Sequence, residues 1–401
     1  MERDGMPKLA VGLDIGSSQI KVCVLKQRGK KYRLVNFGLL PLPPETIVDG
    51  EILNSAALVS SIRELLASQN IRVRDACLGL GGASVILRQI SLPRMSEEEL
   101  EESLAWEAKQ YIPFDLEEVY LDFHISPHAP DADQMDVILV AAKRHVVDDY
   151  CAAARLAGLN PVVVDIHAFA LVNSLEISRP DLANTCVCLI DVGANQTAFV
   201  VTRGGEVMQS RSREAGSNSI TENLQRNLAI PFAQAEAFKS GGAGMGVVPA
   251  DVQQLLEQGF NELADEVRQM LDYHIDQGGD PPEIGLVSGG GARSQTLIQA
   301  LSQKLGFPCE ATNPFGQMVL ANKAINVPLL EAVAPQAAIS AGMATRASLD
   351  RLNTSKEREK KSKQLAAAAE QEDTETTEIT DTEPTEVGFD ATEADGEHVE
   401  P

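Results

Sequence analysis

The sequence predicts an α/β protein, and three observations lead to that prediction. A strand, a turn of small residues and a return strand occur near the start of the chain, and the same layout recurs in its middle. A third buried strand runs into three glycines and a capped helix. With 401 residues, 44% hydrophobic and 23% charged, the chain is long enough for two or three domains with filled cores.

The first hairpin extends from Lys8 to Leu25. Apolar residues such as Val11 and Leu13 alternate with smaller or polar ones, which is the pattern of a half-buried strand. The small residues Gly16-Ser17-Ser18 form the predicted turn, with Asp14 at its start. The sequence therefore predicts an acidic side chain at the tip of this hairpin.

The next segments predict a helix from Ala56 to Leu66, a strand from Ala76 to Leu80 and a second helix after Ser96. Ser96 can accept a hydrogen bond from a free helical amide, and Glu99 three positions on completes a capping box. We expect this helix to end at about Tyr111, because a proline follows two positions later.

The second hairpin repeats the layout of the first with little identity. A strand from Cys186 to Ile190 leads into the turn Asp191-Val192-Gly193-Ala194-Asn195, and a return strand runs from Thr197 to Thr202. This turn also combines one acid with small residues.

The third strand runs from Ile284 to Ser288 and is followed directly by Gly289-Gly290-Gly291. Ser294 is a natural N-cap for a helix from Gln295 to Leu305. Strand, glycines and helix together predict a tight connection that a ligand can approach closely.

Charge and composition exclude several classes of function. The net charge is -24, so nothing in the composition attracts a nucleic-acid backbone. No stretch is as long and apolar as a membrane span, and the first residues lack the apolar core of a signal peptide, so we expect a cytoplasmic protein. Six scattered cysteines without a C-x-x-C pair predict buried, reduced thiols, and the histidines lack metal-ligand spacing.

The C-terminal segment differs in composition from the rest. Residues 364 to 401 carry thirteen acidic residues and no Lys or Arg, and residues 351 to 363 carry six basic and two acidic ones. Residues 1 to 350 are left with a net charge of about -15. Few branched apolar residues occur in 349 to 401, so the composition predicts a disordered charged tail.

The acidic turns predict a site for a metal-bound phosphate. A concave row of backbone amides at Gly16, Ser17 and Ser18 binds anionic oxygens, and Lys21 adds a positive charge. A carboxylate beside a phosphate is favourable if Mg²⁺ stands between them. Asp14 and Asp191 are therefore the candidate metal ligands. The chain has neither a P-loop motif nor a complete dinucleotide fingerprint.

The three turns resemble the motifs of the actin-like ATPase superfamily. Asp14 to Ser18 with Lys21 matches its first phosphate motif, Asp191 to Asn195 with Thr197 its second, and Val287 to Arg293 its adenosine motif. Within the superfamily the chain is similar to the type IV pilus assembly protein family PilM, itself similar to the division protein FtsA. The stretch Trp106 to Phe114, followed by residues 120–125 and 136–144, resembles the subdomain inserted in that family.

The resemblance covers residues 7 to about 348 and implies an actin-like fold of two lobes, each a mixed sheet flanked by helices, with the nucleotide between them. The implied parts are the first lobe (7–86 and 154–183), the FtsA-like inserted subdomain (87–153), the second-lobe core (184–215 and 281–330), its helical cap (216–280), a closing helix (331–348) and the disordered acidic tail (349–401).

The resemblance also implies ATP and Mg²⁺ as cofactors. The implied cofactor-binding residues are Asp14, Gly16, Ser17, Ser18, Lys21, Asp191, Gly193, Asn195, Thr197, Gly216, Glu222, Gly289, Gly290, Gly291 and Arg293. The family leads us to expect an acid at position 167, but the sequence has His167, with Asp165 as a nearby acid. A carboxylate there could order water near the γ-phosphate, whereas a neutral imidazole could act differently or only pack at the start of a helix. Asp165 and His167 are the candidate catalytic residues. We therefore expect ATP binding, with slow or absent hydrolysis.

The family implies a peptide partner. Its members bind the cytoplasmic N-terminal peptide of the inner-membrane protein PilN beside the inserted subdomain, so the chain would reach the membrane only through this partner. The candidate partner-binding residues are Trp106, Tyr111, Ile112, Pro113 and Phe114, although they could instead fill the subdomain's own core. Other platform proteins and self-association are further expected contacts. A small-molecule kinase of the same superfamily and an FtsA-like filament-forming division protein remain alternatives.

Overall fold

A computed structural model of the chain describes residues 8–28, 31–126, 133–240, 249–321 and 325–346. The predicted disordered tail, residues 349–401, lies outside the described residues. The predicted α/β class is confirmed, and the two hairpins form the centres of two separate sheets.

The first sheet has six strands in the order β10-β6-β1-β2-β3-β16. Strands β1, β2 and β3 form an antiparallel meander, while β6 and β10 run parallel to β1 and β16 runs parallel to β3. The register places Asp14 opposite Lys21. The strands are β1 (Lys8–Ile15), β2 (Gln19–Arg28), β3 (Lys31–Pro41), β6 (Asp75–Leu80), β10 (Asn160–Ile166) and β16 (Val319–Leu320).

The second sheet repeats the plan of the first with five strands in the order β13-β12-β11-β14-β15. Again an antiparallel meander is extended by parallel strands, since β14 runs parallel to β11 and β15 to β14. The strands are β11 (Val187–Val192), β12 (Thr197–Arg203), β13 (Glu206–Arg213), β14 (Ile284–Ser288) and β15 (Cys309–Ala311). The sequence repeat therefore corresponds to a repeat in the fold.

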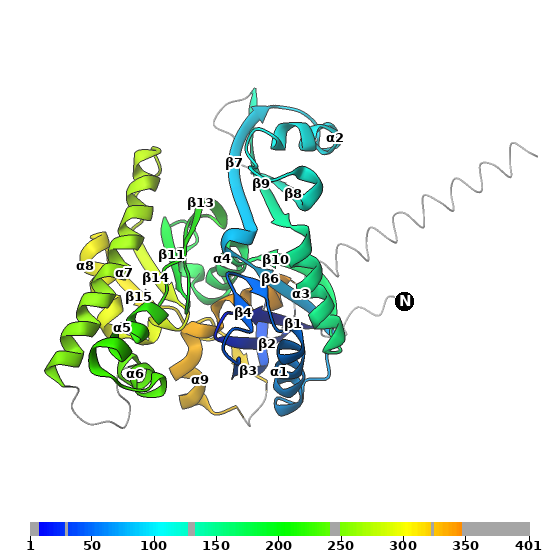
Figure 1. The fold of residues 1–401 in the computed structure, drawn as a ribbon. Helices are drawn as coiled ribbons and strands as arrows, with labels where there is room; N and C mark the ends of the chain where they lie inside the picture. Colours follow the sequence, from blue (N-terminus) through cyan, green and yellow to red (C-terminus); the bar gives the residue numbers. More distant parts are fainter. Residues whose placement is uncertain (1–7, 29–30, 127–132, 241–248, 322–324, 347–401) are drawn as a thin grey trace, which may run out of the picture. The chain divides into compact units, whose positions relative to one another are not determined.

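A third sheet, with strands in the order β7-β9-β8, carries helix α2 (Glu97–Ala108) (Figure 1). Its strands are β7 (Val85–Pro93), β8 (Val119–Ile125) and β9 (Gln134–Lys143). The predicted capping box at Ser96 is present. The helix ends at Ala108 rather than at about Tyr111, because residues 109–111 already form a turn ahead of Pro113.

Helix α3 (Arg144–Leu156) marks the limit of this inserted unit. The helix falls partly within the range 87–153 predicted for the inserted subdomain. Its buried residues Val146, Tyr150 and Ala154 pack in the same core cluster as the first sheet. We therefore propose that the inserted subdomain ends with β9.

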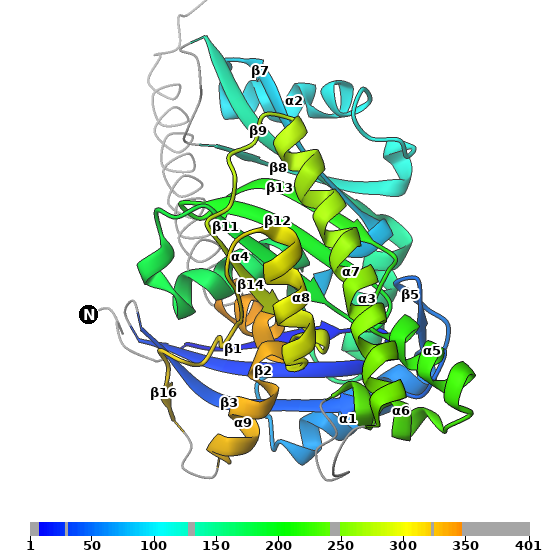
Figure 2. The same cartoon turned by 90° about the vertical axis from the view of Figure 1, so that its left-hand side faces the viewer.

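Helices pack on both main sheets. Helices α1 (Ser55–Ser68) and α3 pack on the first sheet, and α5 (Asn218–Leu228), α6 (Phe232–Lys239), α7 (Ala250–Asp276) and α8 (Gln295–Leu305) share a core with the second. Figure 2 shows α7 and α8 crossing in front of the second sheet. Ser294 caps α8 as predicted, because its side chain accepts from the Leu297 amide.

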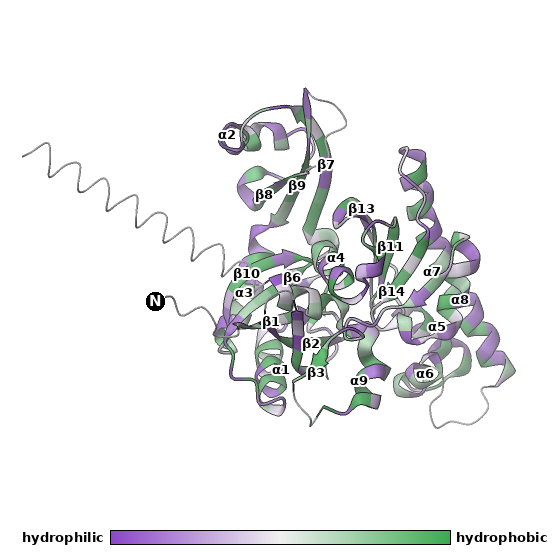
Figure 3. Ribbon diagram, turned by 180° about the vertical axis from the view of Figure 1, so that it is seen from behind, coloured by the Kyte–Doolittle hydropathy of each residue, from purple (hydrophilic) through white to green (hydrophobic). Residues whose placement is uncertain are grey.

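Helix α4 (His167–Ser178) belongs to a core cluster that joins the two main sheets. This cluster contains Ala10 and Cys77 of the first sheet, Val187 and Leu189 of the second, and α4 residues such as Leu171. Helix α4 therefore buries Ala168, Ala170, Leu171, Val172 and Leu175 in this cluster, and its ribbon includes apolar, green stretches in Figure 3.

The last described helical segment starts with α9 (Val327–Val333), continues through a 3-10 turn (Ala334–Ala337) and runs on to residue 346. By length and composition, residues Val327–Arg346 form the only described helix that could span a membrane. However, 67% of its apolar window is buried inside the molecule, and Ile339 and Met343 pack in the cluster that joins the sheets. The segment thus packs as a core helix.

Short elements complete the described fold: β4 (Ile47–Val48), β5 (Glu51–Ile52) and 3-10 turns at Gly82–Ser84, Leu116–Glu118, Pro180–Leu182 and Gly291–Arg293.

The six cysteines are free, and all except the half-buried Cys309 are buried, as the sequence predicted.

Candidate functional site

The two acidic turns close with the same backbone hydrogen bond. The Gly16 amide donates to the Gln19 carbonyl over 3.0 Å, and the Gly193 amide donates to the Gln196 carbonyl over 2.9 Å. Asp14 and Asp191 each stand two residues before the glycine, at the next-to-last position of a strand. The resemblance between the turns thus extends to backbone geometry.

Asp14 forms an ion pair within the first turn. Its side chain is 4% exposed, and its Oδ2 lies 2.9 Å from Nζ of Lys21 on the neighbouring strand. Burial alone lowers the pKa of Lys21, but the charges of Asp14 and, further away, Asp191 outweigh this effect and raise it. Lys21 therefore stays charged.

Asp191 has no lysine in the corresponding position. Its Oδ1 accepts a hydrogen bond of 2.7 Å from Oγ of Ser288, at the end of β14. Burial raises the pKa of Asp191, and the Ser288 hydrogen bond and the Lys21 charge only partly offset this, while Asp14 raises it further. The mutual influence of Asp14, Lys21 and Asp191 places both predicted metal ligands in one electrostatic neighbourhood.

The third turn packs directly on the second. A Cβ atom on Gly289 would lie 2.4 Å from the Val192 carbonyl oxygen, and one on Gly291 would lie 2.5 Å from a Val192 methyl carbon. Gly289 also has a φ of +83°, which favours glycine. Only Gly290 of the three glycines is exposed, and a Cβ there would have just one contact, at 3.7 Å with Nε2 of Gln336. Gly290 is therefore the glycine open to a ligand.

Residues 335 and 336 link the third turn to the first. The Gly289 amide donates to the Pro335 carbonyl over 2.9 Å. The buried Gln336 donates from Nε2 to Oε1 of Gln19 over 3.3 Å. The third turn, far from the others in the sequence, thus contacts the second turn directly and the first turn through residues 335 and 336. Arg293, the last residue of the predicted adenosine motif, is exposed.

The segment before α5 crosses the second turn. The Ser217 amide donates to the Gly193 carbonyl over 3.0 Å, and the Asn218 amide donates to the Ala194 carbonyl over 2.8 Å. A Cβ on Gly216 would lie 2.3 Å from the Ala194 carbonyl oxygen, so this crossing needs glycine. Nδ2 of Asn218 also donates to Oδ1 of Asn195 over 2.8 Å.

Two of the predicted cofactor residues, Thr197 and Glu222, stand apart from the contacts that join the three turns. Thr197 is fully buried, and its Oγ1 donates to the Ala215 carbonyl over 2.7 Å, so its hydroxyl serves the fold. Glu222 lies on the exposed side of α5. Both assignments remain predictions, and the structure gives the hydroxyl of Thr197 a structural partner.

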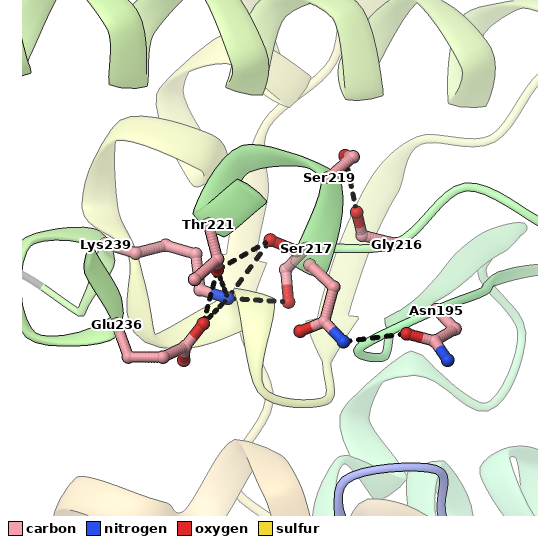
Figure 4. A network of polar contacts seen from close by, with 8 residues as sticks. Asn195, Gly216, Ser217, Ser219, Thr221, Glu236 and Lys239 are labelled. Atoms are coloured by element: carbon pink, nitrogen blue, oxygen red, sulfur yellow. Dashed lines mark hydrogen bonds and ion pairs between the residues drawn. The ribbon is translucent and has the colours of Figure 1, made fainter. Parts of the chain in front are cut away.

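The sequence did not identify a buried charged network beside the second turn (Figure 4). Lys239, 8% exposed, donates from Nζ to the Ser217 carbonyl over 3.1 Å, to Oγ1 of Thr221 over 2.7 Å and to Oε1 of Glu236. Burial lowers the pKa of Lys239, although Glu236 partly offsets this. Glu236 and Lys239 are the two charged residues of α6 and stand three positions apart, and that spacing could have identified the pair.

His167 and Asp165 lie at the junction of β10 and α4. His167 is the first residue of α4, and its ring fills the space that a Cβ on Gly81 would need, 2.4 Å from Nδ1. Its Nε2 is buried without a hydrogen-bond partner among the described residues. Asp165 is 7% exposed, and its Oδ1 accepts from the Ile166 amide over 2.8 Å. His167 also lowers the pKa of Asp191, so it lies near the acidic turns.

The five candidate partner-binding residues divide into two groups. Trp106 and Tyr111 are 66% and 38% exposed, and Pro113 is also exposed. Ile112 is 5% exposed and packs with the half-buried Phe114 in the core of the three-stranded sheet. The aromatic residues thus serve both as core and as free surface.

The family model of the type IV pilus assembly protein PilM matches residues 12–348. The chain belongs to this family. A solved structure described as a PilM-PilN type IV pilus biogenesis complex is 31% identical, with a TM-score of 0.75, and the match covers 84% of this chain and 98% of the other.

A second solved structure supports the actin-like fold of this PilM family member. It is the ethanolamine utilization protein EutJ from Carboxydothermus hydrogenoformans, 15% identical, with a TM-score of 0.53. The match covers 85% of this chain and 90% of EutJ. The predicted actin-like ATPase fold is therefore confirmed.

Proposed function

We propose that the protein is a cytoplasmic, ATP-binding scaffold of the type IV pilus assembly platform and that it binds the N-terminal peptide of a PilN-type inner-membrane protein. Membership of the PilM family supports the pilus role. The observation that carries the nucleotide proposal is that Asp14, Lys21 and Asp191, from the two acidic turns, lie close enough to interact electrostatically.

The donor set of the turns fits Mg²⁺ with a triphosphate. Two carboxylates offer oxygen ligands, and Mg²⁺ prefers one or two carboxylates together with waters and phosphate oxygens. One oxygen of each carboxylate already accepts from the protein, Asp14 from Lys21 and Asp191 from Ser288. The other oxygen of each would face the metal or its waters. The metal would neutralise phosphate charge, and Lys21 would add a cation beside it.

The adenosine would lie beside the third turn and the α5 segment. Gly290 leaves open space, and Lys239 holds the Ser217 carbonyl, so the segment that crosses the second turn is fixed before ligand arrives. Glu222 and Arg293 are exposed and free to contribute to the rim of the site.

Hydrolysis would be slow or absent. A carboxylate near the γ-phosphate can order water, but position 167 holds an imidazole packed beneath Gly81. Asp165 is buried at the end of β10, and its Oδ1 accepts from the Ile166 amide over 2.8 Å. ATP would therefore act by holding the two lobes together.

The partner peptide would dock beside the inserted subdomain. Trp106, Tyr111 and Pro113 offer exposed apolar surface there, while Ile112 and Phe114 support the turn from within. A partner anchored in the inner membrane would keep the protein peripheral to it. Other platform proteins and further copies of the chain would assemble around this pair.

The nucleotide proposal is tested by calorimetry of the full chain with ATP, with and without Mg²⁺. Metal-dependent binding is expected, and its absence would contradict the proposal. Arms with sugars or acetate test the kinase alternative, and ATP-dependent pelleting without a pilus partner tests the filament alternative.

The partner proposal is tested with a synthetic PilN N-terminal peptide and the variant Trp106→Ala. Since Trp106 is 66% exposed, the variant should fold normally and lose peptide affinity by about tenfold or more. Phe232→Ala, which removes a 51% exposed aromatic residue on α6, is the matched control. Equal affinity in both variants would remove Trp106 from the interface.

A further inference from the structure

The first sheet carries an acidic turn where β1 ends and basic residues where β1 begins. Three stretches of the sequence meet at this second end, because residues 26–33 join β2 to β3, residues 63–75 lead into β6 and residues 153–160 lead into β10. Together they hold nine basic and two acidic residues, a net charge of +7, while residues 1–350 carry about -15. We propose that these stretches, the basic end of the first sheet, bind the anionic headgroups of a phospholipid bilayer. The inference rests on the proposed location at the inner membrane, but its test needs neither nucleotide nor PilN.

Strand register places part of this charge in one row. Lys26 on β2 pairs with Leu9 on β1 and with Arg33 on β3. Residues directly opposite each other on antiparallel strands have side chains on the same face, so Lys26 and Arg33 form a cationic pair. Arg74 directly precedes β6, which runs parallel to β1 from the same end. With adjacent strands about 4.8 Å apart, the backbones of Arg74 and Arg33 are about 14 Å apart.

The C-terminus of α3 brings further arginines to the basic end. Nη2 of Arg63 on α1 donates to the Leu156 carbonyl over 2.5 Å. A Cβ on Gly158 would lie 3.6 Å from Nη1 of Arg74, and Arg155 stands in the last turn of α3. Cations are favourable at this negative end of a helix, so part of the group also stabilises the fold.

The arginines of the basic end are not neutralised by the protein. Four of them are exposed and form no ion pair with a carboxylate in the described part of the chain: Arg63, Arg72, Arg74 and Arg155. Of the two acids in the same stretches, Asp75 accepts a 2.7 Å hydrogen bond from Nδ2 of Asn160. On α7, by contrast, Arg268 pairs with Asp272. The charge of the basic end is therefore available to an external anion.

The arrangement fits a bilayer better than an acidic peptide. The cations come from separate segments across the width of the sheet, and none of them lines the cavity of about 270 Å³ that β7 and β13 border. A peptide needs a groove or a free strand edge that fixes its backbone. Lipid headgroups can rearrange laterally beneath fixed cations, so a wide set of charges is sufficient for them.

Two exposed apolar side chains stand among these cations. Leu156, next to Arg155, is 60% exposed, and Val319, paired with Arg33, is 57% exposed. Apolar side chains beside basic ones can enter the boundary between headgroups and acyl chains, while guanidinium groups bind phosphate oxygens. An acidic solute would make no use of this apolar surface.

The last described helical segment leads to the same end. It passes the acidic turns at Gln336, and its Ala344 packs in the core cluster that contains Leu25 and Leu34, the neighbours of the cationic pair in sequence. The sequence then continues into residues 351–363, which carry six basic and two acidic residues. Runs of four to eight Lys and Arg are typical of segments that bind anionic lipid. The basic composition therefore continues along the chain.

The test is sedimentation of the full chain with lipid vesicles, without ATP and without PilN. Vesicles of equal parts phosphatidylglycerol and phosphatidylcholine are compared with vesicles of phosphatidylcholine alone. We expect binding to the anionic vesicles only. Binding should weaken as salt is raised, because the Debye length falls to about 8 Å at physiological ionic strength.

Variants locate the lipid surface. Arg72→Gln and Arg155→Gln should each lower partitioning onto anionic vesicles about fivefold, the contribution expected of one basic residue near such a surface. The matched control is Arg226→Gln, which removes an exposed arginine of α5 in the second lobe and should have no effect. Leu156→Gln should weaken binding at both salt concentrations. Thermal unfolding checks that all four variants are folded.

Several outcomes would overturn the proposal. These are absence of vesicle binding, equal binding to both kinds of vesicle, and an equal loss in Arg226→Gln and Arg72→Gln. Loss of binding in Lys360→Gln/Lys361→Gln, with Arg72→Gln and Arg155→Gln unaffected, would assign the lipid contact to residues 351–363 alone. Binding of a polyglutamate peptide without binding of vesicles would assign the basic end to an acidic protein partner. Vesicle binding by a chain that fails to bind the PilN peptide would support this inference and contradict the partner proposal.

Discussion

The first and second acidic turns share a backbone but differ in their charge partners. Residues 14–21 and 191–198 occupy the same positions in the two hairpins, with Asp14 opposite Lys21 and Asp191 opposite Ala198. Asp14 therefore has a cation 2.9 Å away, whereas Asp191 accepts from a neutral serine.

This difference separates stability from ligand binding. Lys21 compensates the buried charge of Asp14, so removal of Lys21 would leave an unpaired charge inside the folded protein. Burial of Asp191 is only partly compensated, which raises its pKa, so a bound cation would gain more from Asp191. The first turn is therefore expected to dominate unfolding experiments and the second to dominate metal-dependent binding.

The largest effect is expected from Lys21→Met. Removal of the cation leaves the buried Asp14 carboxylate uncompensated, which costs about 3 to 5 kcal/mol in the free energy of unfolding. Urea denaturation measures this loss. The double variant Asp14→Asn/Lys21→Met should recover much of it. Lys304→Met breaks an exposed pair with Asp265 and should cost about 1 kcal/mol or less. If Lys21→Met and Lys304→Met lost similar amounts of stability, the buried Asp14–Lys21 pair would have no special role in the fold.

The next effect concerns the third turn, which packs directly on the second turn. Gly289→Val places a side chain against the Val192 carbonyl and forces a residue with φ of +83°, so about 2 to 4 kcal/mol of stability should be lost. Gly290→Val has open space and should stay folded but lose ATP affinity. Thermal unfolding measures the stability loss of Gly289→Val, and calorimetry measures the ATP affinity of Gly290→Val. Normal ATP binding by Gly290→Val would exclude the third turn from the site.

Asp191→Asn tests the role of the second turn directly. The amide cannot supply a charged oxygen, so affinity for ATP with Mg²⁺ should fall on the order of tenfold, about 1.4 kcal/mol. Stability without ligand should stay the same or rise, because a partly buried charge is removed. Calorimetry with Mg²⁺ and with EDTA checks both points. A loss seen equally without metal would contradict a metal role.

The smallest effect is a pH dependence of stability that originates from Asp191. Its pKa is raised by folding, so between the unfolded and folded pKa values the native state binds more protons. Stability from this group therefore increases as pH falls through the folded pKa. Urea denaturation between pH 7 and 5 should show this gain relative to Asp191→Asn. An identical pH profile in the two proteins would contradict it.

Local patterns predicted the elements around the turns well. The alternation around Asp14 and the cap at Ser294 gave the hairpin and helix α8 at nearly the observed residues. The predicted end of α2, at about Tyr111, was three residues too late. A proline marks the latest position at which a helix can end, but residues 109–111 already form a turn before it. No local pattern indicated that the Thr197 hydroxyl donates to the Ala215 carbonyl, and the assignment of Thr197 to the ligand stays a prediction.

The sequence by itself determined the two hairpins, their acids and the family, because strand alternation, small turn residues and caps act over a few neighbouring positions. The tertiary structure decided which acid is paired, that Gly290 is the open glycine, and that Lys239 lies beneath the second turn. These properties depend on strand register and on contacts between segments more than twenty residues apart. Burial and charge at such contacts are set only when the chain is folded.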